Sequence, residues 1–194
     1  PYTSTAALTR PDSVTVAEIS SFQLETIDTF HPQVSAILNI TPDHLNRHHT
    51  MENYIKAKED ITKNQGTADA CVLNYEDEVL RAFGQTLKTR VIWFSGVQPL
   101  EEGLWFDGKS IFIRRDGQTE KVCDISELNL LGRHNYENVM AAVAISLELG
   151  VPMDSIRGTL RRFTAVEHRI EFVATKGGVA YYNDSKGTNP DAAI

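Results

Sequence analysis

An acid and an imidazole follow a short apolar run in the first quarter of the chain. Residues 34–38 are typical of a buried strand, and Pro42 stops it, which leaves Asp43 and His44 in the loop beyond. Ligands and metal ions gather at the carboxyl ends of strands in open α/β sheets. The stretch therefore indicates a metal or ligand site, although a polar turn with Asp43 as a helix cap explains the same residues equally well.

A carboxylate lies at the end of an earlier apolar row. The β-branched residues in 14–19 predict a strand, on which Val14, Val16 and Glu18 share one face. An apolar row that ends in an acid favours a functional role for Glu18 over a surface one. Ser20 and Ser21 follow as candidates for capping a helical turn.

A lysine interrupts the apolar stripe of the next element. Residues 51–64 predict a helix with Thr50 as its N-cap, and Lys58 lies inside the apolar stripe whereas Lys56 and Lys63 do not. A lysine in such a place either extends its amine to the rim or points into a site. The sequence leaves both readings open.

Polar residues open two segments of the second half. Asn135 and Asn138 share a face near the start of a long helix that Gly150 ends, where amides either bracket a planar heterocycle or cap the helix. Residues 183–190 place Asp184, Lys186 and Thr188 in one loop. A generic turn uses Asn, Asp and Gly but does not need a lysine and a threonine beside them.

The elements that must position these residues alternate between strand and helix. Strands over 70–74 and 91–95 flank a helix over 76–87, and further helices follow over 139–149 and 153–163. This alternation predicts an α/β fold with a mostly parallel sheet flanked by helices and joined by right-handed crossovers.

One stretch matches the phosphate-loop pattern in its residue types but not in its predicted secondary structure. Gly103 to Ser110 fit G-x-x-x-x-G-K-[ST], but that loop must open a helix, and here a strand pattern follows Ser110. Asp107-Gly108 is a hairpin-turn signal, and so we expect a small antiparallel β meander over 104–123. The sequence therefore predicts no phosphate loop in this chain.

Composition narrows the class of protein. The chain has 194 residues and a net charge of −7, which argues against nucleic acid as the main partner. No apolar run approaches the ~20 residues of a membrane span, and Cys71 and Cys123 lie in apolar runs typical of reduced core thiols. We expect a cytoplasmic monomer that does not bind a membrane.

Both ends suggest part of a longer protein. The chain begins with Pro1, and its last four residues look like the first turn of a helix. With a boundary near 165–167, we expect one domain over 1–166 and the start of another over 167–194.

Several motifs together resemble the Mur ligases, the ATP-dependent amino-acid-adding enzymes of peptidoglycan synthesis. They are the segments 18–25, 39–47, 54–58, 132–138, 167–171 and 183–188, in the family's order and spacing. The resemblance implies the family's central ATPase domain, here without its phosphate loop, followed by the first strands of a Rossmann-like C-terminal domain. Glu18 to Leu24 is similar to the members that add D-glutamate to UDP-N-acetylmuramoyl-L-alanine, because Phe22 stands where diaminopimelate- or lysine-adding members usually have His.

The resemblance also implies roles for individual residues. Glu18 and His44 would bind Mg²⁺, in two sites of the intact enzyme, beside a carbamylated Lys58. Asn135, Asn138, Arg169 and Asp184 would contact ATP. Lys186 and Thr188 would face the acyl-phosphate and D-glutamate, and Ser20 and Ser21 would lie close to the muramoyl substrate. Lys58, His44 and Lys186 would thus be catalytic.

The chemistry suits these residue types. Phosphoryl transfer from ATP to the substrate carboxylate needs charge neutralisation and in-line positioning more than proton transfer. Carbamylation would make Lys58 an anion and remove its repulsion from Mg²⁺. The alternatives are another Mur-type ligase, a folylpolyglutamate synthetase or cyanophycin synthetase-like enzyme, and a non-catalytic nucleotide-binding module. The fragment by itself is expected to be inactive.

Overall fold

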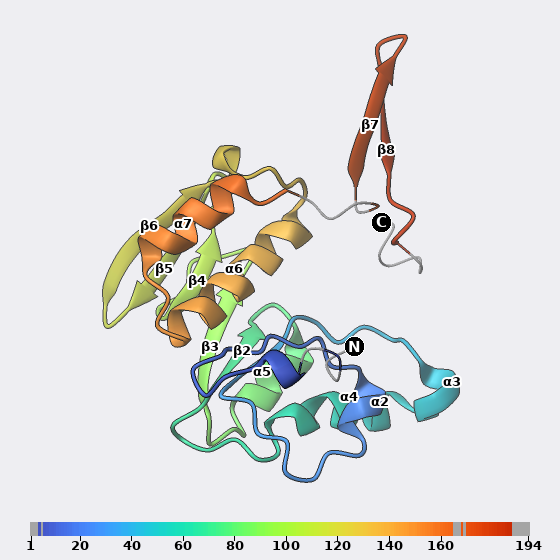
Figure 1. Ribbon diagram of the computed structural model, residues 1–194, viewed down its shortest axis with the longest axis vertical. Coiled ribbons are helices and arrows are strands. Elements are labelled where there is room, and N and C mark those ends of the chain that lie inside the picture. The colour runs from blue at the N-terminus through green and yellow to red at the C-terminus, as the bar shows by residue number, and fades with distance from the viewer. Residues whose placement is uncertain (1–3, 5, 165–167, 169, 188–194) are drawn as a thin grey trace. The chain divides into compact units, whose positions relative to one another are not determined.

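The computed structural model describes residues 4, 6–164, 168 and 170–187, and the chain divides into two compact units (Figure 1). One unit combines Pro1–Pro32 with Thr41–Asn64. The other combines Gln33–Ile40 with Gln65–Ile194. The chain therefore leaves the first unit for one strand and returns to it before it completes the second.

A six-stranded sheet organises the second unit, in the order β1 to β6. The first four strands are parallel and the last two pairs are antiparallel, which confirms the mostly parallel sheet and the meander. The strands are β1 (Val34–Ile37), β2 (Ala70–Asn74), β3 (Arg90–Ser95), β4 (Gly103–Phe106), β5 (Ser110–Arg115) and β6 (Gln118–Asp124). All of β2 is buried, as expected of a parallel strand with both faces covered.

Helix α6 (Arg133–Glu148) forms the core with the sheet. It contacts the first four strands, and its buried residues Met140 and Val143 join Phe94 and Leu104 in one apolar cluster. Helix α7 (Met153–Arg162) packs on α6 and β6, and α5 (Glu78–Gly84) packs on β2. A 3-10 turn, η3 (Ile125–Glu127), follows β6.

The phosphate-loop pattern at 103–110 is accidental, as predicted. Gly103 begins β4 and Gly108 lies in the turn between β4 and β5. Lys109 ends that turn, and Ser110 begins β5 rather than a helix. The Oδ1 atom of Asp107 accepts hydrogen bonds from the backbone N–H of Lys109 and Ser110 at 2.9 and 2.8 Å. These bonds close a hairpin turn. A phosphate loop instead presents the backbone N–H groups at the start of a helix, and no helix starts in this stretch.

Short helices make up the first unit. They are η1 (Ala6–Leu8), α2 (Ser21–Leu24), α3 (Leu45–His48), α4 (Met51–Glu59) and η2 (Asp60–Thr62). The predicted N-cap of α4 is confirmed, because Thr50 Oγ1 accepts from the N–H of Asn53 at 3.2 Å. The helix expected over 51–64 is α-helical to Glu59 and continues as η2.

Three predicted elements differ from the structure, and one of them is the helix predicted over 139–149, which begins earlier, at Arg133, as α6. The strand predicted over 14–19 is wrong: these residues are neither strand nor helix, and Val16 is 84% exposed. Strand propensity acts through pairing and packing, and no strand pairs with this segment in the described part of the chain. Helix α5 is shorter than 76–87, because Asp77 caps it and places its start at Glu78.

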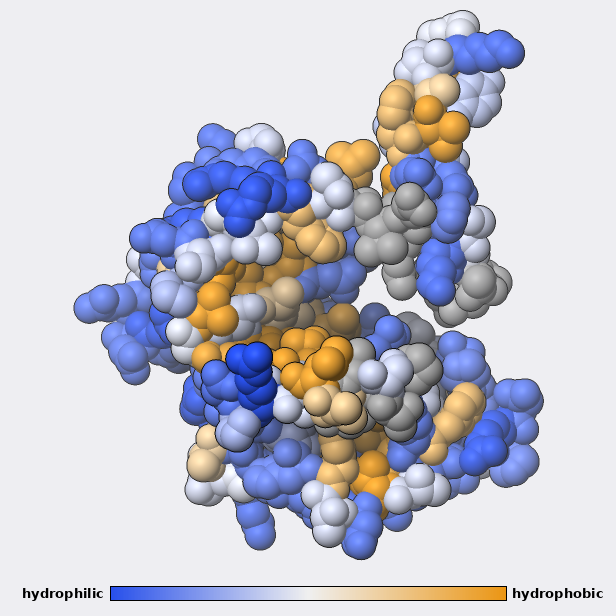
Figure 2. Space-filling model, in the orientation of Figure 1, coloured by the Kyte–Doolittle hydropathy of each residue, from blue (hydrophilic) through white to orange (hydrophobic). Residues whose placement is uncertain are grey.

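A hairpin follows the core elements in sequence. Strands β7 (Glu171–Lys176) and β8 (Val179–Asn183) pair antiparallel, joined by Gly177 and Gly178, which both have positive φ. Phe172 and Tyr181 remain more than half exposed, and hydrophobic residues lie on the hairpin's surface (Figure 2).

Candidate active site

The backbone of His44 is left-handed. It has φ 53° and ψ 26°, and it stands directly before α3 without making a side-chain cap. Asp43 Oδ1 accepts from the backbone N–H of His44 at 2.8 Å, and its Oδ2 lies 3.6 Å from His44 Nε2. Asp43 therefore holds the residue beside it and does not cap the helix. Non-glycine residues in this region are uncommon, and they often occur at functional sites.

The two serines before and in α2 have different partners. Ser20 is the N-cap: its hydroxyl accepts from Gln23 N–H, while Gln23 Oε1 accepts from Ser20 N–H at 2.9 Å in a capping box. Ser21 is buried, and its Oγ lies 2.9 Å from Nε2 of His48. The hydroxyl of Ser21 is thus turned to the interior of the unit, whereas Ser20 is exposed.

Lys58 lies in the half-buried stripe of α4. Its Nζ is 5.1 Å from the ring centroid of the buried Tyr54, whereas Lys56 and Lys63 are exposed. An ammonium over an aromatic face is attracted by the ring quadrupole. The position predicted from the stripe is confirmed, and the cation–π contact adds a structural role for the amine.

The predicted metal ligands come from one unit. Glu18 lies exposed in the extended segment before α2, His44 precedes α3, and Lys58 is on α4. Helix α4 contacts both α2 and α3. The fold therefore brings together the elements around the predicted ligands, with Ser20 and Ser21 at the start of α2.

The donor chemistry of these residues suits Mg²⁺. No three His, Cys, Asp or Glu side chains converge in a metal-binding arrangement within the described residues. Such a cluster is not required, because Mg²⁺ is usually bound by one or two carboxylates together with substrate phosphates and water. Glu18 would supply one carboxylate, and a carbamate on Lys58 would supply a second anionic oxygen donor.

In the second unit, polar side chains tie together the carboxyl ends of the parallel strands. Asn74 Nδ2 donates to Leu38 O at 3.2 Å beyond β1, and Asp77 Oδ2 accepts from the N–H of Ile40 at 2.7 Å. Asp77 Oδ1 also accepts from two N–H groups in the first turn of α5. One carboxylate thus both caps α5 and fixes the chain just before the Thr41–His44 stretch.

The first turn of α6 is anchored to the loop after β3. Arg133 Nε donates to Gly96 O at 3.0 Å, and the carboxylate of Glu137 packs so close to Gly96 that a Cβ there would lie 2.3 Å from Oε1. Burial raises the pKa of Glu137, and the nearby Glu76 carboxylate adds to this, while Arg133 and His134 oppose it. The start of α6 is therefore held by a specific polar contact.

Asn135 and Asn138 line a cavity of about 580 Å³ between α6 and α7. The amide nitrogen of Asn135, Nδ2, donates a hydrogen bond to Leu131 O at 2.6 Å. The cavity is otherwise mainly apolar; its further lining includes Leu38, Val139, Ser146, Ile156, Thr159 and Phe163. Ligand sites typically combine apolar walls with a few polar groups, and this cavity does so.

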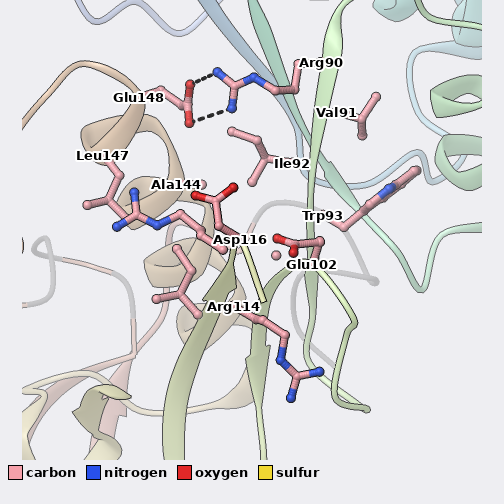
Figure 3. A pocket seen from close by; sticks show the side chains of 13 residues that line it. Arg90, Val91, Ile92, Trp93, Glu102, Arg114, Asp116, Ala144, Leu147 and Glu148 are labelled. Carbon is pink, nitrogen blue, oxygen red and sulfur yellow. Dashed lines mark hydrogen bonds and ion pairs between the residues drawn. The ribbon is translucent and has the colours of Figure 1, made fainter. Parts of the chain in front are cut away.

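A second cavity, of about 300 Å³, lies at the amino end of β3 (Figure 3). Arg90 and Glu148 pair across one side through two hydrogen bonds, and Arg114 and Asp116 come from the end of β5 and the turn after it. None of the predicted site residues lines it. Because ligands of parallel sheets bind at carboxyl ends, this end of the sheet is the less favourable place for the site.

The C-terminal predictions are described only in part. Asp184 Oδ1 accepts from the N–H of Ile170 at 3.2 Å just after β8, and the backbone N–H of Lys186 donates to His168 O. The Lys186 side chain is exposed. Arg169 and Thr188 lie outside the described residues.

Comparison with known proteins decides the family. The Mur ligase middle domain matches residues 2–146, which is most of the chain. The chain belongs to the Mur ligase family. The match to the family's middle domain agrees with the parallel sheet and with the central position expected from the motifs.

The chain is similar over its full length to several curated relatives of this family. It is 61% identical to the UDP-N-acetylmuramoylalanine–D-glutamate ligase of Lachnoclostridium phytofermentans over 194 residues, and 55% identical to that of Lachnospira eligens over 193 residues. In both cases all of this chain is covered, but only 43% of the relative. The chain thus spans less than half the length of these ligases.

Solved Mur ligases share its fold. MurF from Acinetobacter baumannii superposes with a TM-score of 0.66 at 23% identity, over 84% of this chain and 36% of that one. MurC from Thermotoga maritima superposes with a TM-score of 0.63 at 22% identity, over 89% of this chain and 38% of that one. These likenesses confirm the α/β fold class.

The structure adds residues that the motifs did not single out in this Mur ligase. His48 and Glu25 contact Ser21 and Arg47, and the ring of Phe22 lies 4.9 Å from that of His44. The four-residue spacing of His44 and His48 was the available signal. That spacing suggests two side chains on one face of a helix. The structure differs, because His44 has a left-handed backbone and lies before α3, so the two histidines do not share a helical face.

Proposed function

We propose that this chain is the central part of an ATP-dependent ligase that adds D-glutamate to UDP-N-acetylmuramoyl-L-alanine, with release of ADP and phosphate. The observation that carries the proposal is the similarity of the whole chain, at 61% and 55% identity, to ligases with this name. Phe22 in the segment 18–25 supports the D-glutamate-adding class. The reaction class is a carbon–nitrogen ligation, and the place of action is the cytoplasm.

In this proposal ATP is bound from more than one segment. Asn135 and Asn138 bracket the adenine or ribose, supported by their place on the wall of a mainly apolar cavity of about 580 Å³. Arg169 and Asp184 approach the ribose and phosphates from residues 167–194, which we assign to the start of a second domain after 1–166. The phosphate loop lies outside this chain, because the one matching stretch is a hairpin.

Mg²⁺ is proposed to bind at Glu18, at His44 and at a carbamylated Lys58, in two sites. When bound, the metal neutralises charge on the transferred phosphoryl group and on the substrate carboxylate. The place of Lys58 supports this proposal, because the side chain is half-buried on α4, in the same unit as Glu18 and His44. Carbamylation forms an N–C bond between the Lys58 amine and CO₂, two protons leave the former ammonium group, and the cation becomes an anion.

The chain's residues then support two successive transfers. The γ-phosphoryl group passes from ATP to the terminal carboxylate of UDP-N-acetylmuramoyl-L-alanine, and ADP leaves. The amine of D-glutamate attacks the acyl carbon, loses a proton, and phosphate leaves as the C–N bond forms. Lys186 and Thr188 face the acyl-phosphate and the D-glutamate, and Ser20 and Ser21 lie beside the muramoyl substrate.

The alternatives predict other substrates or none. A diaminopimelate- or lysine-adding ligase, or a folylpolyglutamate synthetase-like enzyme, keeps the same fold and the same ATP chemistry. A non-catalytic nucleotide-binding module keeps only the fold. The partners we propose are ATP, D-glutamate and UDP-N-acetylmuramoyl-L-alanine, with no nucleic acid or membrane, and the protein acts as a monomer. Within the described residues, no helix has the length and apolar character to cross a membrane.

The test uses the longest natural protein that contains this chain. ADP release is measured with UDP-N-acetylmuramoyl-L-alanine and a panel of acceptors: D-glutamate, diaminopimelate, lysine and glutamyl-folate. We expect release with D-glutamate and a fall of about 100-fold or more in Glu18→Ala, because an anionic ligand to the metal is lost. Glu78→Ala, an exposed acid in the first turn of α5, is the control and should retain wild-type turnover.

Each other result points to a different conclusion. Release with diaminopimelate or another acceptor instead of D-glutamate would keep the ligase class and overturn the substrate. Equal turnover in wild type and Glu18→Ala would overturn the metal role of Glu18. No ADP release with any acceptor would favour the non-catalytic module.

A further inference from the structure

His48 is the centre of a buried polar network in the first unit. It is 4% exposed, and both of its ring nitrogens have partners. Nε2 lies 2.9 Å from Ser21 Oγ, which is 6% exposed, and Nδ1 lies 3.2 Å from Glu25 Oε1. Arg47 NH2 donates to the other carboxylate oxygen of Glu25 at 2.7 Å. The network joins α2 to α3 across 27 residues of sequence.

The direction of these bonds follows from the carboxylate. The hydrogen bond from Arg47 lowers the pKa of Glu25, so this group is an anion and only accepts hydrogen bonds. Nδ1 of His48 must then carry a proton. In the neutral ring Nε2 is left as an acceptor, and the hydroxyl of Ser21 donates to it. One tautomer therefore satisfies all three side chains.

The same imidazole is enclosed by aromatic rings that lead to the predicted metal ligands. Phe22 stacks on His48 with centroids 5.5 Å apart, and it also contacts the ring of His44 at 4.9 Å and the guanidinium of Arg47 at 5.2 Å. Tyr54 lies 5.3 Å from His48, and Lys58 Nζ lies 5.1 Å from the ring of Tyr54. A continuous path of contacts thus runs from His44 to Lys58, with His48 at its midpoint.

The backbone of His48 is fixed as well. Asn53 Nδ2, from the first turn of α4, donates to His48 O at 3.0 Å. His48 therefore connects three elements: α2 through Ser21 and Glu25, α3 through its own backbone, and α4 through Asn53 and Tyr54. These elements carry or adjoin Ser20 and Ser21, His44 and Lys58.

We propose that His48 is a positioning residue, which holds the His44 imidazole and the carbamylated Lys58 side chain in the mutual arrangement that binds the metal ion. This inference rests on the proposed function, since it assigns a role within that metal site. His48 itself is enclosed by protein and does not contact substrate. A displacement of a ligand by about 1 Å lowers activity by about 100-fold, so a rigid support has a measurable effect.

Serine, histidine and glutamate in this order also make up a nucleophilic triad, but the arrangement here cannot act as one. A nucleophilic hydroxyl must reach a substrate, whereas that of Ser21 is buried and faces the ring. Its neighbour Ser20, which is exposed, is committed to the capping box. The network therefore has a structural role, and its loss should change the arrangement of the ligands at the metal site.

The experiment compares His48→Phe, His48→Gln and wild type in the longest natural protein that contains the chain. Phenylalanine retains the aromatic packing with Phe22 and Tyr54 but removes both ring hydrogen bonds, and glutamine retains a polar group. Binding of Mn²⁺, as a probe for Mg²⁺, is measured by calorimetry without nucleotide. We expect affinity to fall about 10- to 100-fold in His48→Phe and less in His48→Gln. ADP release should require correspondingly more Mg²⁺, with little change in KM for D-glutamate.

A second readout addresses the network directly. Long-range ¹H–¹⁵N spectra of the histidines in wild type should show His48 protonated at Nδ1 and bare at Nε2. Ser21→Ala should shift the Nε2 resonance alone. His49→Asn changes an exposed neighbour and suits its positive φ, so it should leave Mn²⁺ affinity, the His48 resonances and turnover unchanged.

The results separate this inference from the proposed function. Wild-type Mn²⁺ affinity and Mg²⁺ dependence in both folded His48 variants would overturn the positioning role. Protonation of His48 at Nε2 alone in wild type would overturn the network. Failure of the wild-type protein to release ADP with any acceptor would instead contradict the proposed ligase, and the Mn²⁺ affinities and the His48 spectra would still decide the positioning role.

Discussion

At the scale of single residues, one substitution can separate the observed contact of Lys58 from the role that we propose for it. Its amine lies over the Tyr54 ring, a contact that any cation could make, whereas the proposed carbamate requires a lysine. Lys58→Arg keeps the cation but cannot be carbamylated in the same way. We expect ADP release to fall by about 100-fold or more, with stability changed by no more than about 1 kcal/mol.

The measurement is turnover with D-glutamate beside thermal unfolding, and intact mass shows whether wild-type Lys58 carries one added CO₂. Lys56→Arg, on the exposed face of the same helix, is the matched control. Wild-type turnover in Lys58→Arg would contradict the proposed carbamate.

At the scale of elements, the start of β4 requires a glycine. Gly103 has φ +116°, and a Cβ there would lie 2.2 Å from the backbone oxygen of Trp93 in the parallel neighbour β3. Gly103→Ala therefore adds a collision with the main chain to the cost of a strained φ, which alone is about 1–3 kcal/mol. We expect the free energy of unfolding to fall by more than that range, as measured with urea.

Gly108→Ala separates the two contributions. Gly108 has φ +97° in the turn that follows β4, and nothing lies within 4 Å of its Cβ position. This variant should show the conformational cost only. Equal losses in the two variants would mean that the approach of β3 to Gly103 adds nothing to the requirement for glycine.

At the scale of the whole molecule, two buried thiols make stability depend on alkaline pH. Burial raises the pKa of both Cys71 and Cys123 from 9.0 to about 11, and for Cys123 the Glu127 and Asp124 carboxylates add to it. The unfolded chain loses these protons first as pH rises. The thiols therefore contribute stability that is fully present below pH 9 and is lost as pH rises toward 11.

The comparison is wild type against the double variant Cys71→Ala/Cys123→Ala. Between pH 8 and pH 10.5, the free energy of unfolding measured with urea should fall more in wild type than in the double variant. The alanines weaken packing equally at both pH values but do not titrate. Iodoacetamide should leave both native thiols unmodified at pH 8 and label them in urea. Equal pH dependence of the two proteins would contradict the shifted pKa values.

The sequence predicted the elements whose signals are local. Strand β2, the meander turn at Asp107-Gly108 and the Thr50 cap depend on residues within a few positions of each other. The apolar stripe likewise placed Lys58 on a half-buried face. The Mur ligase family followed from motifs of this short-range kind. Local propensity was insufficient at 14–19, where a strand needs a partner that the chain's own neighbours do not supply.

Only the tertiary structure decided how the site is supported. Ser21 and His48 are 27 residues apart, and the carboxylate of Asp77 accepts from the N–H of Ile40, 37 residues away. Such contacts depend on how α2, α3 and α4, or β1 and α5, pack, and packing is fixed by the burial of many side chains at once. The sequence therefore determined which residues have the chemistry of a Mur ligase. The fold determined that a buried imidazole, absent from that set, links the elements on which His44 and Lys58 depend.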